Sequence, residues 1–569
     1  MVTEDVAPVH VSSGSHQRTL AWRRAALGAF VHWGPSAILG GEWRGEQIEG
    51  LSEWIRYRAR IPADEYRALA AQFDPTSFDA RDWVSRFVDA GARYLVFTAK
   101  HHDGFAMYRS RASDFNIVDA TPFRRDVLME LAEACRDQGI GLGVYYSQMI
   151  DWDDLDATGP RANEWDRPTR ERSFDRYWAG KAMPQLRELL TGYGDLASVW
   201  FDMAAGMTAE NAREALSAVR ELQPGAVMNS RLGPVEADFT SMNDNYVDNV
   251  PPRTPWELAI TTNETWGYST HPGRWKSTAQ LCRTIAHVAA RGGNTLLNIG
   301  PDGLGAFPET TREQLAGVGE WMRRAAPGIR GVRPSPLQSD LESADLTATD
   351  DALYVHSYAS EARTLVIPGL LSSPEFVRDL ATGASLPHGL RDSGVGTELA
   401  IDVPPTTGDL PATVEVAFSA PPEMAEGIQQ AGQSPSVLLS TASAHRDDQG
   451  GLHWDVRIAD AGEYDVVAVT RETSFSHDPQ WWADRQRGVL HAGDAVIEFA
   501  LSDDAREPDD VLVFWERVCS ALGTFTVIEP GAQRISLQGL RVVDDKWDAD
   551  GVNLAGIRLQ RRAHPHPHA

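Results

Sequence analysis

Polar and aromatic side chains end several apolar runs in the first half of the chain. His32 follows AFV, His101 and His102 follow YLVFTAK, Tyr145 ends GLGVY, and Arg231 follows VMNS. Imidazole, phenol and guanidinium groups can hydrogen-bond several hydroxyls, while aromatic rings stack on an apolar face. This combination of residue types is typical of a pocket that holds a sugar.

Asp202 ends a further run of this kind, LASVWFD. Period-2 alternation along a strand places Trp200 and Asp202 on one face of that strand, and Val199 and Phe201 on the other. If the first face lines a pocket, the carboxylate stands at its mouth beside an aromatic wall.

Taken singly, these residues have ordinary structural explanations. A lone His32 is more often a hydrogen-bonded core residue, Trp200 is more often packing, and Arg231 alone is a surface ion pair. His101 and His102 point to opposite faces if the strand continues, so we expect histidines that hydrogen-bond and no metal site. The recurrence of such residues at several strand ends favours a shared site.

The elements that position these residues alternate between apolar runs and amphipathic segments up to about residue 330. RRDVLMELAEACRDQG and TAENAREALSAVRELQPG read as helices, the second with a threonine cap and a Pro-Gly end. Repeated strand and helix units predict an α/β fold, a (β/α)8-type TIM-like barrel whose active site lies at the carboxyl ends of the strands. A doubly wound sheet is the alternative, and the absence of GxGxxG after these strands weakens its dinucleotide-binding version.

The pattern changes to short alternating strands beyond the barrel. We predict a barrel domain at residues 1–335, a β-sandwich at 336–425, and a second β-sandwich at 426–569 that resembles a carbohydrate-binding module. The stretch GIQQAGQSPS reads as a linker. Trp481 and Trp482 are either a stacking platform for a glycan or buried packing residues.

The composition excludes several classes of partner. The net charge of −27 repels phosphate backbones and anionic lipids, so we expect neither a nucleic acid nor a membrane partner. The three cysteines are far apart and form no CxxC pair, which fits a reducing compartment. With no signal peptide visible at the N-terminus, we expect a cytoplasmic, bacterial protein.

Several motifs resemble a known family. FVHWG, KHHDGF, GVYYSQMIDW, VWFD, NETWGY and LLNIGPDG occur in the order found in the retaining α-L-fucosidases of glycoside hydrolase family 29, and the likeness covers about residues 20 to 330. The resemblance implies a barrel backed by a β-sandwich, a double-displacement mechanism, and no metal or cofactor. Two departures concern substrate preference: Met203 stands where the family usually has glycine, and Asn229, Ser230 and Arg231 replace NDR.

The resemblance also assigns residues. Asp202 matches the nucleophile of the family, and Trp266 is expected near the methyl group of the sugar. The remaining residues expected to line the fucose pocket are His32, Glu53, Trp54, His101, His102, Tyr145, Trp200 and Arg231. Tyr146 is the alternative to Tyr145.

The acid/base partner of Asp202 lies on a variable loop of the family. Registering NSRLG upstream and PWEL with TWGY downstream places Asp244 at that position. Glu257 is the rival, because its neighbour Trp256 would desolvate it and raise its pKa, as a general acid requires. An ion pair between Glu257 and Arg231 is the structural explanation for that glutamate.

The resemblance therefore implies an enzyme that removes terminal α-linked L-fucose from a fucosylated oligosaccharide or glycoconjugate. Two alternatives stay open at this stage: a fucose-binding protein without turnover, and a barrel glycosidase acting on a related sugar such as a β-galactoside. Linkage preference, the role of the C-terminal domain and assembly into a homo-oligomer also stay open.

Overall fold

The structure is a computed structural model, and it falls into two compact units. It describes residues 15–159, 161–166, 171–337, 340–341, 344–392, 397–406, 410–425, 427–430, 436–473, 485–509, 511–543 and 551–562. We call the first of the two compact units the barrel unit; it comprises residues 1–245, 252–281 and 293–323. The second, the sandwich unit, comprises residues 246–251, 282–292 and 324–569.

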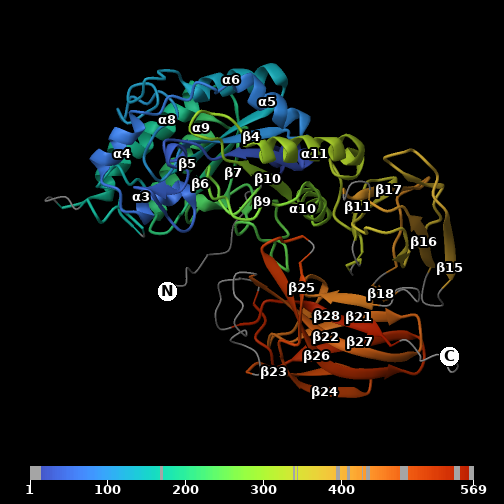
Figure 1. Cartoon of the computed structure of the whole chain (residues 1–569). Coiled ribbons are helices and arrows are strands. Elements are labelled where there is room, and N and C mark those ends of the chain that lie inside the picture. Colours follow the sequence, from blue (N-terminus) through green and yellow to red (C-terminus); the bar gives the residue numbers. More distant parts are fainter. Residues whose placement is uncertain are drawn as a thin grey trace. The chain divides into compact units, whose positions relative to one another are not determined.

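A sheet of eight parallel strands forms the centre of the barrel unit (Figure 1). Its order is β7-β6-β5-β4-β1-β10-β9-β8, which follows the chain around a circle. An isolated parallel bridge from Asn229 to Phe239 joins the edge strands β7 and β8. A parallel sheet in this circular order is a (β/α)8-type barrel, so the predicted fold class is confirmed and the doubly wound alternative is excluded. The strands are β1 Leu27–Val31, β4 Tyr94–Lys100, β5 Gly141–Ser147, β6 Leu196–Asp202, β7 Val227–Met228, β8 Thr240–Ser241, β9 Trp256–Thr261 and β10 Asn294–Ile299.

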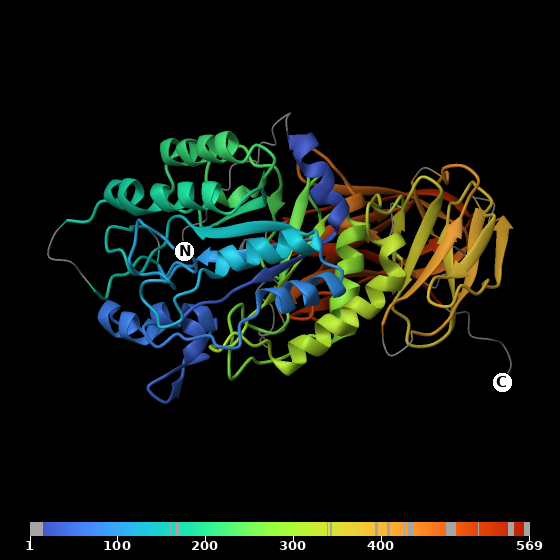
Figure 2. The same ribbon diagram turned by 90° about the horizontal axis from the view of Figure 1, so that it is seen from above.

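Helices surround these strands, as the two views in Figures 1 and 2 show. They are α1 Ser15–Ala25, α2 Ser36–Leu39, α3 Ile55–Arg58, α4 Ala63–Ala70, α5 Ala80–Asp89, α6 Val127–Gln138, α7 Phe174–Tyr177, α8 Met183–Gly192, α9 Ala209–Leu222, α10 Thr278–Ala290 and α11 Glu309–Ala325. Short turns of helix add η1 Ser52–Trp54, η2 Trp178–Ala182 and η3 Ser230–Leu232, and a hairpin adds β2 Glu42–Trp43 and β3 Glu46–Gln47.

The two helices predicted from sequence begin at side-chain caps. The Thr208 hydroxyl accepts a hydrogen bond from the Asn211 amide at the start of α9, which confirms the predicted threonine cap. Asp126 accepts from the Met129 amide at the start of α6. These bonds satisfy backbone donors that a helix start leaves without an intrahelical partner.

The residues on the inner face of the barrel form an aromatic core. Trp200 lies there with Phe30, Tyr94 and Tyr145, each contributed by a different strand. This confirms that the face of β6 shared by Trp200 and Asp202 is directed toward the barrel axis.

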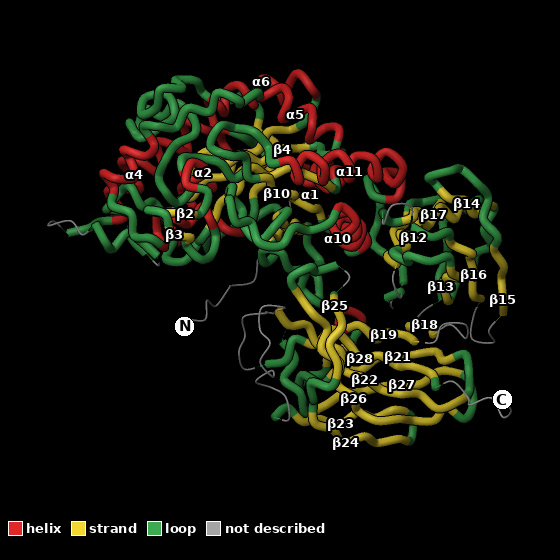
Figure 3. The backbone as a smooth tube through the Cα atoms, viewed as in Figure 1, coloured by secondary structure: helices red, strands yellow, loops and turns green. Residues whose placement is uncertain are grey.

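Two pairs of mostly antiparallel sheets make up most of the sandwich unit, and Figure 3 shows this part as strands joined by loops. The first pair encloses one apolar cluster, which includes Leu353, Ile367 and Val416. Its strands are β11 Ala344–Ala348, β12 Ala352–Ser357, β17 Ala412–Ala417 and β14 Phe376–Asp379 in one sheet, with β13 Arg363–Pro368, β16 Thr397–Val403 and β15 His388–Asp392 in the other.

The second pair of sheets encloses a larger cluster that includes Trp454 and Leu559. Its strands are β18 Ile428–Gln430, β20 His445–Arg446, β21 Leu452–Ile458, β27 Gly531–Gln538, β23 Arg487–Ala492 and β24 Ala495–Ala500 in one sheet, with β19 Ser436–Ser440, β28 Leu554–Arg561, β22 Gly462–Thr473, β26 Trp515–Val527 and β25 Ala505–Pro508 in the other. Two β-sandwiches thus follow the barrel, as predicted.

The stretch read as a linker is not wholly a connection. Residues 428–430 pair in parallel with β21, because their backbone groups complete the edge of that sheet. Residues 431–435, together with Trp481 and Trp482, lie outside the described residues. The boundaries at 335/336 and 425/426 stay a prediction. Among the described residues, no helix combines the length and the hydropathy needed to cross a membrane.

Candidate active site

Asp202 is the last residue of β6, and its carboxylate is held by several donors. The Tyr145 hydroxyl donates to Oδ2 at 2.9 Å, the Arg231 guanidinium donates to Oδ1 at 3.2 Å, and the Met203 amide donates to Oδ1 at 3.0 Å. The Asp202 amide in turn donates to the Gln148 side chain at 3.0 Å. The side chain is 15% exposed, so the carboxylate is oriented but reachable.

Opposing influences act on the pKa of Asp202. Burial raises it, and the nearby carboxylate of Asp244 raises it further. The Arg231 charge and the hydrogen bonds from Tyr145 and Arg231 lower it. These donors therefore favour the ionised form that a nucleophile requires, against the cost of burial.

Arg231 connects two carboxylates. Its Nη1 donates to Asp202, and its Nη2 donates to Oδ1 of Asp244 at 2.5 Å and to the Met242 carbonyl at 2.8 Å. The guanidinium lies over the Trp200 ring, 4.9 Å from its centroid. Asp202 and Asp244 are thus bound to neighbouring nitrogens of one planar cation, which brings two carboxylates of different exposure into one site.

Asp244 and Glu257 occupy different environments. The Asp244 side chain is 44% exposed, on the loop after β8. Glu257 is 1% exposed near the start of β9, where it accepts hydrogen bonds from the Tyr94 hydroxyl at 2.5 Å and the Trp200 indole at 3.0 Å. Burial raises the pKa of Glu257 to about 7, as sequence reasoning anticipated. Glu257, the carboxyl with the raised pKa, thus lies near the start of β9 against the Trp200 indole. It does not lie at the carboxyl ends of the strands.

Met203, one of the two departures from the family pattern, and Asn229, which directly precedes the other departure at Ser230, both lie next to the end of β6. Met203 adopts φ +55°, in the left-handed region that costs a side-chain-bearing residue about 1–2 kcal/mol. The Asn229 side chain accepts from the Phe201 amide and donates to the Phe201 carbonyl, both at 2.9 Å. Asn229 therefore fixes the end of β6 just before Asp202.

Histidines that directly follow strands β1 and β4 face the same region. Nε2 of His102 lies 3.6 Å from Asp202 Oδ2, and its Nδ1 lies 2.7 Å from the Ser147 hydroxyl. Burial lowers the pKa of His102 to about 3 and of His32 to about 4, so both imidazoles are neutral at pH 7. Nδ1 of His32 donates to the Asn298 amide oxygen at 2.6 Å, which makes its Nε2 an acceptor.

The expectation that His101 and His102 point to opposite faces is wrong. Their ring centroids lie 4.3 Å apart. Strand β4 ends at Lys100, so the period-2 alternation of a strand does not apply to the two residues that follow. His101 also stacks on Tyr145, at 5.5 Å and 10°. Among the described residues, no group of three or more His, Cys, Asp or Glu could hold a metal ion.

Glu53 is a buried carboxyl with one oxygen in use. Its Oε2 accepts from the Gly267 amide at 2.9 Å and the Thr265 hydroxyl at 3.2 Å. Its Oε1 is buried and, within the described chain, has no hydrogen-bond partner. Burial raises the pKa of Glu53. A buried oxygen without a hydrogen-bond donor destabilises the folded protein, unless the hydroxyl of a ligand donates to it.

Two tryptophans, one at the end of η1 and one on the loop after β9, stand next to the histidines. The Trp54 ring lies 5.0 Å from His102 at 77°, and the Trp266 ring lies 5.1 Å from His32 at 44°. Tyr146, the alternative to Tyr145, donates instead to Gln185 at 3.0 Å. The structure thus brings the predicted residues together around Asp202 and places Tyr146 elsewhere.

Sequence reasoning missed the polar residues that position this set. Gln148 joins the Asp202 amide to the Arg231 carbonyl, to which it donates at 2.9 Å. Asn298 joins His32 to the Trp266 carbonyl, to which it donates at 2.7 Å. Both stand within or just after apolar strand runs, and that contrast is the signal that could have found them.

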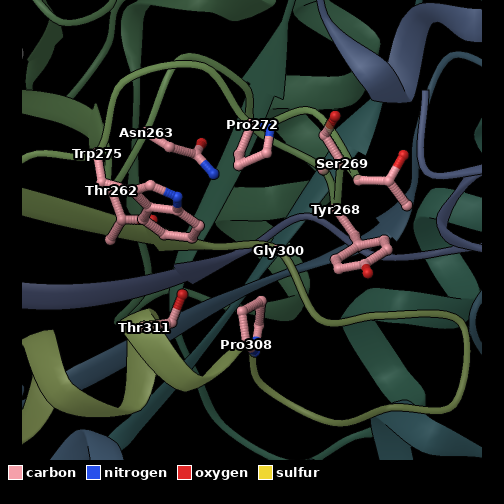
Figure 4. A pocket seen from close by; sticks show the side chains of 11 residues that line it. Thr262, Asn263, Tyr268, Ser269, Pro272, Trp275, Gly300, Pro308 and Thr311 are labelled. Carbon is pink, nitrogen blue, oxygen red and sulfur yellow. The ribbon is translucent and has the colours of Figure 1, made fainter. Parts of the chain in front are cut away.

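A separate pocket of about 190 Å³ lies beside the loop that carries Trp266 (Figure 4). Tyr268, Ser269 and Trp275 line it from that loop, and Pro308 and Thr311 line it from the start of α11. Gly267, whose amide bonds to Glu53, connects it with the site. None of the predicted site residues belongs to its lining.

Comparisons with known proteins point to one family. The model of the family described as alpha-L-fucosidase matches residues 4–326. The tissue alpha-L-fucosidase of Rattus norvegicus is 29% identical over 365 residues, which are 58% of this chain and 74% of the relative. The plasma alpha-L-fucosidase of Homo sapiens is 26% identical over 369 residues, covering 60% and 75%.

Solved structures give the same result. An alpha-L-fucosidase from Vibrio sp. strain EJY3 superposes with a TM-score of 0.90 at 30% identity, over 97% of this chain and 98% of that one. An alpha-L-fucosidase from Lactobacillus casei, solved in complex with alpha-L-fucose, is 39% identical and covers 54% of this chain and 99% of its own, with a TM-score of 0.52. The first of these likenesses extends through the sandwich unit.

Proposed function

Since this chain belongs to the alpha-L-fucosidase family, we propose that it acts by a retaining double displacement with Asp202 as nucleophile and Asp244 as general acid and base. The chain is a glycoside hydrolase that cleaves α-L-fucosides. The observation that carries the proposal is the Arg231 guanidinium, which binds both carboxylates. A retaining glycosidase needs its two carboxyl groups about 5 to 5.5 Å apart, and a shared guanidinium favours such closeness.

In the first step, the ionised carboxylate of Asp202 attacks the anomeric carbon, and Asp244 protonates the departing glycosidic oxygen. The carbon–oxygen bond to the aglycone breaks as an ester bond to Asp202 forms. In the second step, Asp244 takes a proton from water, and that water displaces Asp202 from the sugar. Two inversions return the original α configuration.

Different parts of the site suit the two sides of the sugar. Oε1 of Glu53 and Nε2 of His32 are acceptors for ring hydroxyls, since neither is used as a donor or acceptor within the described residues. His101, His102 and Tyr145 add further polar groups around Asp202. Trp266 supplies an apolar surface for the methyl group of a 6-deoxy sugar.

Of the two candidate carboxyls, Asp244 on the β8–β9 loop and Glu257 in β9, Asp244 suits the acid/base role better. The exposed Asp244 can meet a glycosidic oxygen and then a water molecule. Glu257 is occupied by Tyr94 and Trp200 in the barrel interior. The earlier alternatives, a binding protein without turnover and a β-galactosidase, are not favoured by the family assignment.

The substrate is a fucosylated glycan, and we propose a cytoplasmic location for its hydrolysis. The support is the state of Cys135, Cys282 and Cys519, which are free and buried. Thiols without disulfide partners are typical of reducing compartments. Fractionation of the source cells would test this, and activity recovered outside the cytoplasm would contradict it.

The test of the proposed mechanism is hydrolysis of an aryl α-L-fucoside followed by NMR. Retention predicts that α-L-fucose forms first and then mutarotates. If β-L-fucose forms first, the double displacement is wrong. If no fucose is released, the chain binds without turnover.

A further inference from the structure

The loop that carries Asp244 passes from one unit of the chain to the other. Met242 and Asn245 donate backbone hydrogen bonds to the Glu257 and Ala259 carbonyls, at 2.9 and 3.0 Å, within the barrel unit. Residues 246–251 then belong to the sandwich unit. Asp244 therefore stands two residues before a segment whose contacts are made with the C-terminal strands.

The first of those contacts converge on Asn553, directly before β28. Its Nδ2 donates to the Tyr246 hydroxyl at 2.7 Å, and its Oδ1 accepts from Nδ2 of Asn249 at 2.5 Å. All three side chains are buried. The Tyr246 ring also packs on Trp515 of β26, with ring centroids 4.4 Å apart.

Arg471 of β22 completes the arrangement. Its Nη1 donates to Oδ1 of Asn249 at 2.8 Å, and its Nε donates to Asp509 at 3.1 Å. Its backbone amide donates to the Asn553 carbonyl at 3.0 Å. The Asn249 amide thus has a partner at its oxygen and another at its nitrogen, and both partners come from the C-terminal β-sandwich.

A buried polar network with specific partners at each end fixes a backbone segment in one geometry, because breaking a single bond leaves a desolvated polar group. We propose that Asn553 and Arg471 of the C-terminal β-sandwich are positioning residues for the reaction, which hold segment 246–251 and through it set the place of Asp244 beside Arg231. This inference rests on the proposed role of Asp244 as acid/base. It gives the last sandwich a function other than glycan binding.

The test compares two substrates in Asn553→Ala. An alkyl α-L-fucoside has a poor leaving group that needs protonation, whereas a dinitrophenyl α-L-fucoside does not. We expect kcat/KM to fall on the order of 10-fold for the alkyl substrate and less than about 2-fold for the dinitrophenyl one. An equal loss on both substrates overturns the proposal, because a merely structural defect does not depend on the leaving group.

Thr470→Val is the matched control. Thr470 is a buried residue of β22 next to Arg471, and its hydroxyl donates to the Val518 carbonyl at 3.3 Å within the sandwich. This variant removes a buried hydrogen bond without touching segment 246–251, so its two kcat/KM values should change by the same small factor. A leaving-group dependence in Thr470→Val as large as in Asn553→Ala overturns the proposal.

Tyr246→Phe repeats the test if Asn553→Ala does not fold. It removes only the hydroxyl that bonds to Asn553 and retains the ring on Trp515, so we expect the same selective loss in smaller degree. Activity on the alkyl substrate equal to that of the native protein overturns the proposal.

Asp244→Ala separates the two hypotheses. If Asp244→Ala shows no leaving-group dependence, the acid/base assignment fails and the positioning role fails with it. If Asp244→Ala shows that dependence and Asn553→Ala does not, only the positioning role fails. In the double variant Asp244→Ala/Asn553→Ala, we expect kcat/KM for the alkyl substrate to equal that of Asp244→Ala alone. The reason is that both residues act through the carboxyl of Asp244.

Discussion

The Tyr145 hydroxyl donates a hydrogen bond to Oδ2 of Asp202 at 2.9 Å. This bond lowers the pKa of Asp202, whereas burial raises it. Removal of the donor in Tyr145→Phe therefore raises the pKa of Asp202, and the nucleophile ionises only at higher pH. We expect the acidic limb of the kcat/KM profile to move to higher pH and the plateau to fall on the order of 10-fold.

Tyr146→Phe is the control for this prediction. Tyr146 is the next residue of β5, but its hydroxyl donates to Gln185, away from Asp202. The pH profile of this variant should match that of the native enzyme. If both phenylalanine variants move the acidic limb equally, the role of Tyr145 is wrong.

Met203→Gly tests the strain next to the nucleophile. Met203 holds φ +55°, which glycine adopts freely, while glycine costs more backbone entropy on folding. We expect a net gain of up to about 1 kcal/mol in the free energy of unfolding, with kcat/KM within about 2-fold of native. Ala204→Gly has no left-handed φ to relieve and should destabilise. If Met203→Gly loses as much stability as Ala204→Gly, the claim that the backbone of Met203 is strained is wrong.

Because the pKa of Glu257 is raised in the folded protein, we expect the free energy of unfolding to depend on pH. Its pKa is about 7 in the folded protein against 4.5 for the free group, so between these values the unfolded chain loses a proton that the folded chain keeps. Stability therefore falls as pH rises through this window. Glu257→Gln does not titrate, so its stability relative to native should rise by on the order of 3 kcal/mol from pH 4.5 to pH 7.

Thermal unfolding at pH 4.5 and pH 7.5 measures this difference. Glu221→Gln on α9 is the control, since Glu221 is exposed and its replacement should leave the difference between the two pH values unchanged. A pH-independent offset between Glu257→Gln and the native protein would show that Glu257 titrates normally.

We expect Trp266 to make the enzyme prefer a sugar with a methyl group to one with a hydroxymethyl group. Its ring lies beside His32, where an apolar surface suits a methyl group better than a hydroxymethyl group. Trp266→Ala should lower the ratio of kcat/KM for an aryl α-L-fucoside to that for the matching α-L-galactoside by about 10-fold. Trp43→Ala, on the β2–β3 hairpin, should leave the ratio unchanged. An unchanged ratio in Trp266→Ala would place the methyl group elsewhere.

The fold was predictable from sequence where the strands are long and apolar. LASVWFD and GLGVYYS gave strands with clear ends, and period-2 alternation correctly placed Trp200 inside the barrel. Strand β8, with two residues, is too short to show a period, and PWEL, where β9 begins, served only to mark the downstream end of a variable loop. A period-based reading needs more residues than β8 has.

The site was predictable at strand ends and less so where the chain turns. His101 and His102 lie beyond the end of β4, so the rule that separates neighbouring side chains misled there. A raised pKa was anticipated for Glu257, but a tryptophan neighbour in sequence does not reveal which end of the barrel a carboxyl faces. The links from Tyr246 and Asn249 to Asn553 join residues about 300 positions apart, and no local pattern announces them.

The configuration of the fucosyl azide formed by two variants tests the central claim most directly. With azide and an activated aryl α-L-fucoside, Asp244→Ala should be rescued and yield α-L-fucosyl azide, because azide attacks the ester on Asp202. Asp202→Gly should fold, lose nearly all turnover, and yield β-L-fucosyl azide, because azide then attacks the substrate itself. Glu257→Ala should show no such rescue. Rescue of Glu257→Ala alone, or α-L-fucosyl azide from Asp202→Gly, would contradict the assignment of Asp202 and Asp244.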